Sequence, residues 1–150
     1  MKIIISTLFL LFGSTVLAED SIEGRYFSDK FIICDTQIDN WPQIQKTGFF
    51  APKELKEIGF IHCSKPSHMP YVIKHYYNQE HRIAWVISPQ KVNPPVIYEG
   101  NHSQPHVYGP LNMSSVVAIF EMKPDVTGKY KIPVEWLPAQ YDLKYICQKQ

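Results

Sequence analysis

The sequence carries little net charge and few charged side chains. Its 150 residues include 15 Lys and Arg against 14 Asp and Glu, and charged residues make up only 19% of the chain. General binding to nucleic acid depends on clustered Lys and Arg that displace the counterions of the phosphate backbone. The composition therefore argues against general nucleic-acid binding. With 45% hydrophobic residues, the chain belongs among ordinary globular proteins.

The sequence also lacks the short motifs of several common enzyme classes. It contains no Gly-x-Ser-x-Gly, no His-Glu-x-x-His, no phosphate-binding glycine loop and no Cys-x-x-Cys. Candidate functional residues must therefore be recognised as single polar side chains in unusual places.

Long apolar runs are scarce, and the clearest apolar segment lies at the start of the chain. Lys2 precedes apolar residues 3–12, and small residues follow up to Ala18. This layout is typical of a secretory signal peptide. The segment is also shorter than the roughly 20 apolar residues of a membrane-spanning helix. We expect cleavage after Ala18 and a secreted or periplasmic protein that starts at Glu19; a retained membrane anchor is the alternative.

Cysteine is rare, with three residues in the chain: Cys34, Cys63 and Cys147. In an oxidising compartment thiols tend to pair, and three cysteines allow three different single disulfides. Cys63 lies in an apolar segment where a reduced thiol can pack as a small hydrophobe. We favour a disulfide between Cys34 and Cys147, with Cys63 reduced. Three free thiols, or a reactive Cys63, remain as alternatives.

The pattern of apolar and turn-forming residues predicts one domain over residues 19–150. Short strands are expected at 31–34, 60–63, 82–87, 96–98 and 116–122, helices near 41–48, 51–58 and 64–78, and loops at 101–105 and 106–112. Gly48 and Gly59 are expected to end the first two helices, and Ser64 to cap the third. This irregular order favours the α+β class over regular βαβ winding.

Five polar residues in three segments are candidates for one cleft. His62 lies inside an otherwise apolar strand and Ser64 directly follows that strand. Glu99 follows a short strand, and His106 and Tyr108 alternate in a segment that is expected to be extended. Each also has a purely structural interpretation, as a hydrogen-bonded core or turn residue. Their occurrence together favours a shared site.

The remaining histidines are weaker candidates, and the sequence predicts no metal site. They lie on a helix face or in loops without a partner at metal-ligand spacing: His68, His75, His81 and His102. A zinc site of His62, Cys63 and His106 is disfavoured, because adjacent strand residues point to opposite faces.

Two linked motifs give the sequence a family resemblance. The segments Gly59-Phe60-Ile61-His62-Cys63-Ser64 and Pro105-His106-Val107-Tyr108-Gly109-Pro110-Leu111 have the forms G-F-I-H-x-S and P-H-x-Y-G-P-L. In this order, with Trp41, Tyr76-Tyr77 and Tyr98-Glu99 between and around them, they resemble the DUF952 family of small uncharacterised proteins. The resemblance covers about residues 30–123.

The resemblance implies a fold like that of ADP-ribosyltransferases: small, packed, mostly antiparallel sheets with two or three flanking helices and a cleft that holds NAD in true transferases. Glu99 would then stabilise an oxocarbenium-like state, His62 would bind a ribose hydroxyl, and Tyr108 would stack on nicotinamide. Ser64 and His106 would complete the ligand-binding lining. NAD is thus the expected substrate, and a host or extracellular protein is a candidate acceptor.

The chain departs from the family pattern at several places. The family usually has Gln where His68 stands and an acidic residue where Ser88 stands, and typical members lack the signal peptide and the extension 124–150. Because fold does not imply function, the competing hypothesis is a non-enzymatic module that binds a small polar ligand in a preformed pocket.

Overall fold

The computed structural model describes residues 27–137, which form eight strands, three α-helices and five short 3-10 helices. The strands are β1 (Ile32–Gln37), β2 (Phe49–Phe50), β3 (Ile61–His62), β4 (Arg82–Ile87), β5 (Val96–Glu99), β6 (Gln104–Val107), β7 (Leu111–Asn112) and β8 (Val116–Met122). The α-helices are α1 (Trp41–Thr47), α2 (Lys53–Ile58) and α3 (Met69–Tyr76). The 3-10 helices are η1 (Ile38–Asn40), η2 (Pro66–His68), η3 (Pro89–Lys91), η4 (Met113–Ser115) and η5 (Val134–Trp136). The expected signal peptide, its cleavage site and Cys147 lie outside the described residues.

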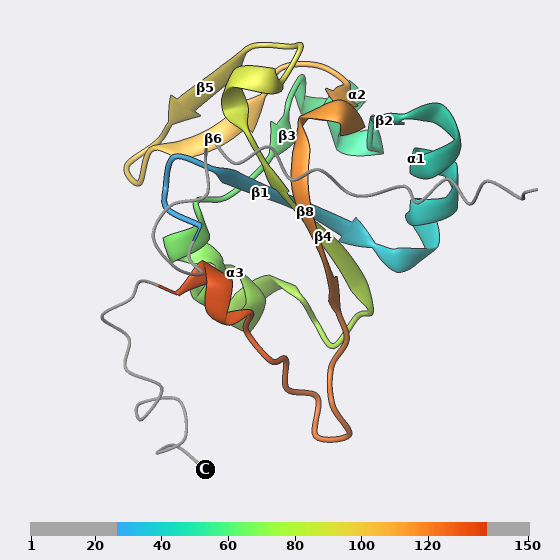
Figure 1. Ribbon diagram of the computed structural model, residues 1–150, viewed down its shortest axis with the longest axis vertical. Helices are drawn as coiled ribbons and strands as arrows, with labels where there is room; N and C mark the ends of the chain where they lie inside the picture. The colour runs from blue at the N-terminus through green and yellow to red at the C-terminus, as the bar shows by residue number, and fades with distance from the viewer. Residues whose placement is uncertain (1–26, 138–150) are drawn as a thin grey trace, which may run out of the picture.

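An antiparallel sheet in the order β1-β4-β8 crosses the middle of the molecule (Figure 1). Its side chains alternate between two faces. On one face Trp85 packs in a core that also includes residues of α1, β2, β3 and β7. On the other face Val86 packs in a core with residues of α3 and with Trp136 of η5. Burial on both faces explains why β4 is apolar from Ile83 to Ile87.

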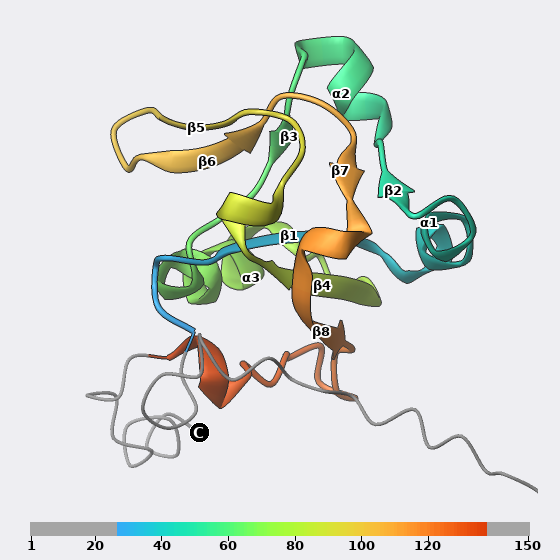
Figure 2. The same ribbon diagram turned by 45° about the horizontal axis from the view of Figure 1, so that its top comes forward.

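A second antiparallel sheet, in the order β3-β6-β5, is joined to the first through β1. Ile33 and Ser64 exchange backbone hydrogen bonds of 2.7 and 2.8 Å, which places the residue after β3 beside β1. The hairpin of β5 and β6 lies on the same side of the molecule as α3 in both views (Figures 1 and 2). The two walls of the site described below come from these elements.

The mixed class with antiparallel sheets and few helices is confirmed, as are several predicted elements. Strands β4 and β8 lie where the apolar runs predicted them, and α1 and α2 end at Gly48 and Gly59, both with positive φ. Ser64 does not cap a helix, since α3 begins at Met69 after η2. The carboxylate of Asp29 instead accepts hydrogen bonds from the backbone N and Oγ of Ser67, which lies in η2 directly before α3.

The predicted loops at 101–105 and 106–112 are partly wrong, because strands β6 and β7 occupy residues 104–107 and 111–112. The proline at position 105 and the polar residues around it obscured the strand pattern. Pro105 has no N–H to donate to the neighbouring strand, but its carbonyl still accepts a bond of 3.0 Å from the backbone N of Cys63, just beyond the end of β3.

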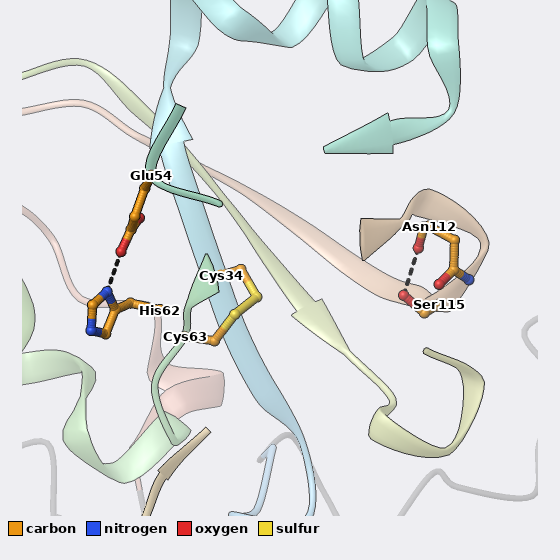
Figure 3. Close-up of a disulfide and its surroundings, with 6 residues drawn as sticks. All are labelled: Cys34, Glu54, His62, Cys63, Asn112 and Ser115. Carbon is orange, nitrogen blue, oxygen red and sulfur yellow. Dashed lines mark hydrogen bonds and ion pairs between the residues drawn. A yellow bond between two sulfur atoms is a disulfide. The ribbon is translucent and has the colours of Figure 1, made fainter. Parts of the chain in front are cut away.

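The predicted Cys34–Cys147 disulfide is wrong: Cys34 is bonded to Cys63, which is therefore not reduced (Figure 3). The cause is the strand register. Because Ile33 and Ser64 form a hydrogen-bonded antiparallel pair, Cys34 and Cys63 are the adjacent non-hydrogen-bonded pair, with Cα atoms 4.5 Å apart. Cross-strand residues in this position have the closest Cα atoms in an antiparallel ladder.

None of the helices described between residues 27 and 137 is long and apolar enough to cross a membrane.

Candidate functional site

A cleft of about 900 Å³ lies between α3 and the β5–β6 hairpin. Its helical wall consists of Ser67, His68, Tyr71, Val72 and Tyr76. Its hairpin wall consists of Glu99, Gly100, Asn101, His102, Gln104 and His106. The remaining lining residues belong to β1, β3 and the segment after β3: Asp35, His62, Cys63 and Ser64. The volume is within the usual range for a small-molecule site, roughly 300–1,000 Å³.

Two histidines form a cross-strand pair in this cleft. His62 of β3 lies directly opposite His106 of β6, and their ring centroids are 4.9 Å apart. The Nδ1 of His62 is hydrogen-bonded to Glu54 of α2 (Figure 3), and the Nδ1 of His106 is 2.8 Å from Glu99 Oε2. A neutral imidazole that donates from Nδ1 keeps Nε2 as an acceptor. Each ring is therefore oriented by a carboxylate, with its other nitrogen available to a ligand.

Glu99 is held by two donors on a single oxygen. Tyr108 donates its hydroxyl to Glu99 Oε2 at 2.5 Å, and His106 Nδ1 donates to the same atom. Oε1 accepts no hydrogen bond from the described residues. The hydrogen bond from Tyr108, followed by that from His106, lowers the pKa of Glu99. The side chain is therefore an oriented carboxylate that is ionised at neutral pH and has one unoccupied oxygen.

Phe60 and Glu54 complete the site, and the sequence hypotheses missed both. The Phe60 ring stacks on His106 with centroids 4.1 Å apart and 14° between the planes, and it also contacts His62 and Tyr108. Phe60 could have been recognised, because residues two apart in a strand share a face. Glu54 carries no such signal, since it lies on α2 and reaches His62 only through the tertiary fold.

The structure brings four of the five predicted site residues to the lining of the cleft. These are His62, Ser64, Glu99 and His106. Tyr108 does not line the cleft, but its hydroxyl donates a hydrogen bond to Glu99. Cys63 lies on the face opposite His62, as the strand pattern predicted, and its sulfur is in the disulfide (Figure 3). Within residues 27–137 no group of three His, Cys, Asp or Glu has an arrangement that could hold a metal.

A family model described as "Protein of unknown function (DUF952)" matches residues 35–119, more than half of the chain. The chain belongs to the DUF952 family. The crystal structure of protein CC0527 from Caulobacter crescentus is similar in fold, with a TM-score of 0.59, 17% identity, and coverage of 71% of this chain and 97% of that chain. The solution structure of CC0527 gives a TM-score of 0.52 at 19% identity, covering 69% of this chain and 91% of that chain. A search of curated proteins gives no match.

The matched DUF952 region includes the five predicted site residues and Cys63 of the disulfide, and it begins one residue after Cys34. At the position where this family resemblance leads us to expect Gln, His68 accepts a hydrogen bond of 2.9 Å from Gln104 Nε2. The residue therefore connects η2 to β6 across the cleft. His68 and His102, which the sequence ranked as weak candidates, both line the cleft. The other two weak candidates, His75 and His81, do not line it.

The electrostatics of the DUF952 site predict that Tyr108→Phe raises the pKa of Glu99 toward its usual value, because the hydroxyl bond is the largest cause of the lowering. A carboxyl with a lowered folded pKa contributes stability above its unfolded pKa and loses it as pH falls through the folded pKa. The substitution should therefore weaken that contribution. A carbon-detected NMR titration of the carboxyl groups measures the pKa directly. Asp125 is the internal control, because its pKa is lowered mainly by a hydrogen bond from Thr127 and should not respond to the substitution. An unchanged Glu99 pKa would contradict the role assigned to the Tyr108 hydroxyl.

Proposed function

We propose that this DUF952 protein binds NAD or a related nucleotide in the cleft and breaks the bond between nicotinamide and ribose. The observation that carries the proposal is Glu99, an oriented and ionised carboxylate with one unoccupied oxygen, at the wall of a cleft large enough for a nucleotide. Transfer to a protein acceptor or to water would give an ADP-ribosyltransferase or an NAD glycohydrolase.

The chemistry requires negative charge at one position. As the bond from the ribose C1′ to the nicotinamide nitrogen breaks, its electron pair leaves with nicotinamide and the ribose develops oxocarbenium character. A fixed carboxylate that accepts a bond from a ribose hydroxyl places its charge beside that developing positive charge, and a preorganised group needs no reorganisation. An acceptor oxygen then bonds to C1′ and loses its proton. Glu99 Oε1 is the atom available for this role.

The neighbouring residues have positioning roles in this proposal. The Nε2 of His62 is available to a ribose hydroxyl because Glu54 occupies Nδ1. His106 and Tyr108 fix Glu99 from two directions. Because the hydroxyl of Tyr108 is already engaged with Glu99 and its ring lies beside Phe60, we assign Tyr108 to holding the carboxylate in place of the stacking role expected from the sequence. Ser64 offers a further hydroxyl at the lining.

One observation favours a non-enzymatic binding module as the second candidate. Glu99 Oε2 and the Nδ1 atoms of His62 and His106 already have protein partners, so these side chains are held in place without a ligand. Such a site can hold a small polar molecule without changing it.

We also propose that the protein acts outside the cytoplasm, as the leader-like first eighteen residues suggest. The Cys34–Cys63 disulfide supports this, because disulfides persist mainly in oxidising compartments. A host or extracellular protein would then be the acceptor.

The two candidate functions separate in one experiment on the wild-type protein. Thermal midpoints are measured with NAD and with ADP-ribose, and nicotinamide release from NAD is followed on the same samples. A ligand at 100 times its Kd should stabilise the fold by about 2.7 kcal/mol. Stabilisation with nicotinamide release is the expected result. Stabilisation without release would support the binding module, and neither effect would reject both candidates.

A further inference from the structure

Helix α3 presents aromatic side chains to the cleft that its own packing does not require. Met69, Ile73 and the following Tyr77 are buried in the core beneath the helix. Tyr71 and Tyr76 line the cleft and are 50% and 62% exposed. Large exposed rings that line a cleft are characteristic of a surface that receives a ligand.

The ring of Tyr71 is held in position before any ligand arrives. His75, one turn along α3, stacks on it with centroids 4.1 Å apart, and His75 Nδ1 donates to the backbone carbonyl of Tyr71 at 2.8 Å. The His68 ring lies edge-on to the Tyr71 ring, with 89° between the ring planes, and it is itself hydrogen-bonded to Gln104 on the opposite wall. The Tyr76 ring also meets the Tyr71 ring edge-on, with 62° between the planes. His75 does not line the cleft, and the Tyr71 ring is half exposed, so a planar ligand in the cleft can reach it.

We propose that Tyr71 is the stacking platform for a purine base of the bound nucleotide. The proposal rests on the proposed function in one respect, that the ligand is a nucleotide. Glu99 on the hairpin wall is assigned to the ribose of the scissile bond, so the base on α3 is the other ring of the dinucleotide, the adenine. A stack between a base and an aromatic side chain needs no base-specific hydrogen bond, and a fixed ring loses little entropy when it forms.

The test compares ligands that do and do not contain the base. The Kd values of AMP and of ribose 5-phosphate are measured calorimetrically for the wild type, Tyr71→Ala and Tyr71→Phe. In Tyr71→Ala the affinity for AMP should fall by roughly 5-fold to 150-fold, the range expected for one lost base–aromatic stack. Affinity for ribose 5-phosphate should stay the same, and Tyr71→Phe should retain AMP binding because it keeps the ring.

The control variant is Phe49→Ala, which removes an aromatic side chain of similar exposure, 47%, outside the cleft. It should leave AMP binding unchanged. Equal AMP affinity in wild type and Tyr71→Ala, or no AMP binding by wild type, overturns the stacking proposal. Because AMP contains no nicotinamide bond, the result is independent of turnover. AMP binding that depends on Tyr71, without NAD cleavage, would support the stacking site and reject the catalytic proposal. NAD cleavage with an unchanged AMP affinity in Tyr71→Ala would support the catalytic proposal and reject the stacking site.

Discussion

Glu99→Gln is expected to abolish most nicotinamide release while leaving the protein folded. Glutamine keeps the shape of the side chain and can still accept the bonds from Tyr108 and His106 through its carbonyl oxygen. It removes the negative charge that the proposed mechanism places beside the oxocarbenium-like ribose. Loss of one preorganised electrostatic contact typically lowers kcat by roughly 100-fold to 1,000-fold. We expect a decrease of that size with a thermal midpoint close to that of the wild type.

Glu57→Gln is the matched control for this experiment. Glu57 belongs to an exposed ion pair with Lys53 on α2 and is not part of the cleft lining. Exposed pairs contribute little to stability, so neither the midpoint nor turnover should change. Full activity in Glu99→Gln would remove this residue from the mechanism. Equal losses in both variants would show that the effect is not specific to the site.

The binding measurement separates transition-state stabilisation from ligand positioning. If Glu99 acts mainly on the developing charge, Glu99→Gln should lower kcat with little change in the affinity for ADP-ribose, which has no bond to nicotinamide. If the residue only grips the ligand, affinity should fall and no turnover should be found in either protein. The second result would favour the binding module.

Local sequence patterns predicted the elements whose stability is decided locally. The strand β4 follows from an apolar run buried on both faces, and the ends of α1 and α2 follow from Gly48 and Gly59, which adopt positive φ. The alternation of His106 and Tyr108 predicted that both point to one side, and both do contact Glu99. Each inference depends on residues close together in the chain.

The features that were missed depend on how separate elements are placed by the fold. Nothing near Glu54 indicates that α2 reaches His62, because the contact joins a helix to the following strand across the turn at Gly59. The wrong disulfide has its origin in strand pairing. The cysteines were assigned by their surroundings in the chain, whereas the pairing of Ile33 with Ser64 decides which two thiols meet.

Removal of the disulfide is the second change with a large expected effect, in this case on stability. Cys34→Ala/Cys63→Ala should lower the free energy of unfolding by about 3.6 kcal/mol, the loop-entropy value for a sequence separation of 29 residues. Urea unfolding of the oxidised protein measures this difference. Cys147→Ala is the control: it should have no such effect, since Cys34 is already bonded to Cys63. Large and equal losses in Cys147→Ala and in the double variant would restore the Cys34–Cys147 pairing.

The same double variant should also weaken the site, because β3 contains only two residues and His62 immediately precedes the bridged Cys63. Without the disulfide, the segment after β3 is held to β1 by the backbone bonds between Ile33 and Ser64. We expect a loss of ADP-ribose affinity even at temperatures where the variant remains folded. An unchanged affinity in the folded variant would show that the pairing of β3 with β6 positions His62 by itself, and that the disulfide stabilises the fold alone.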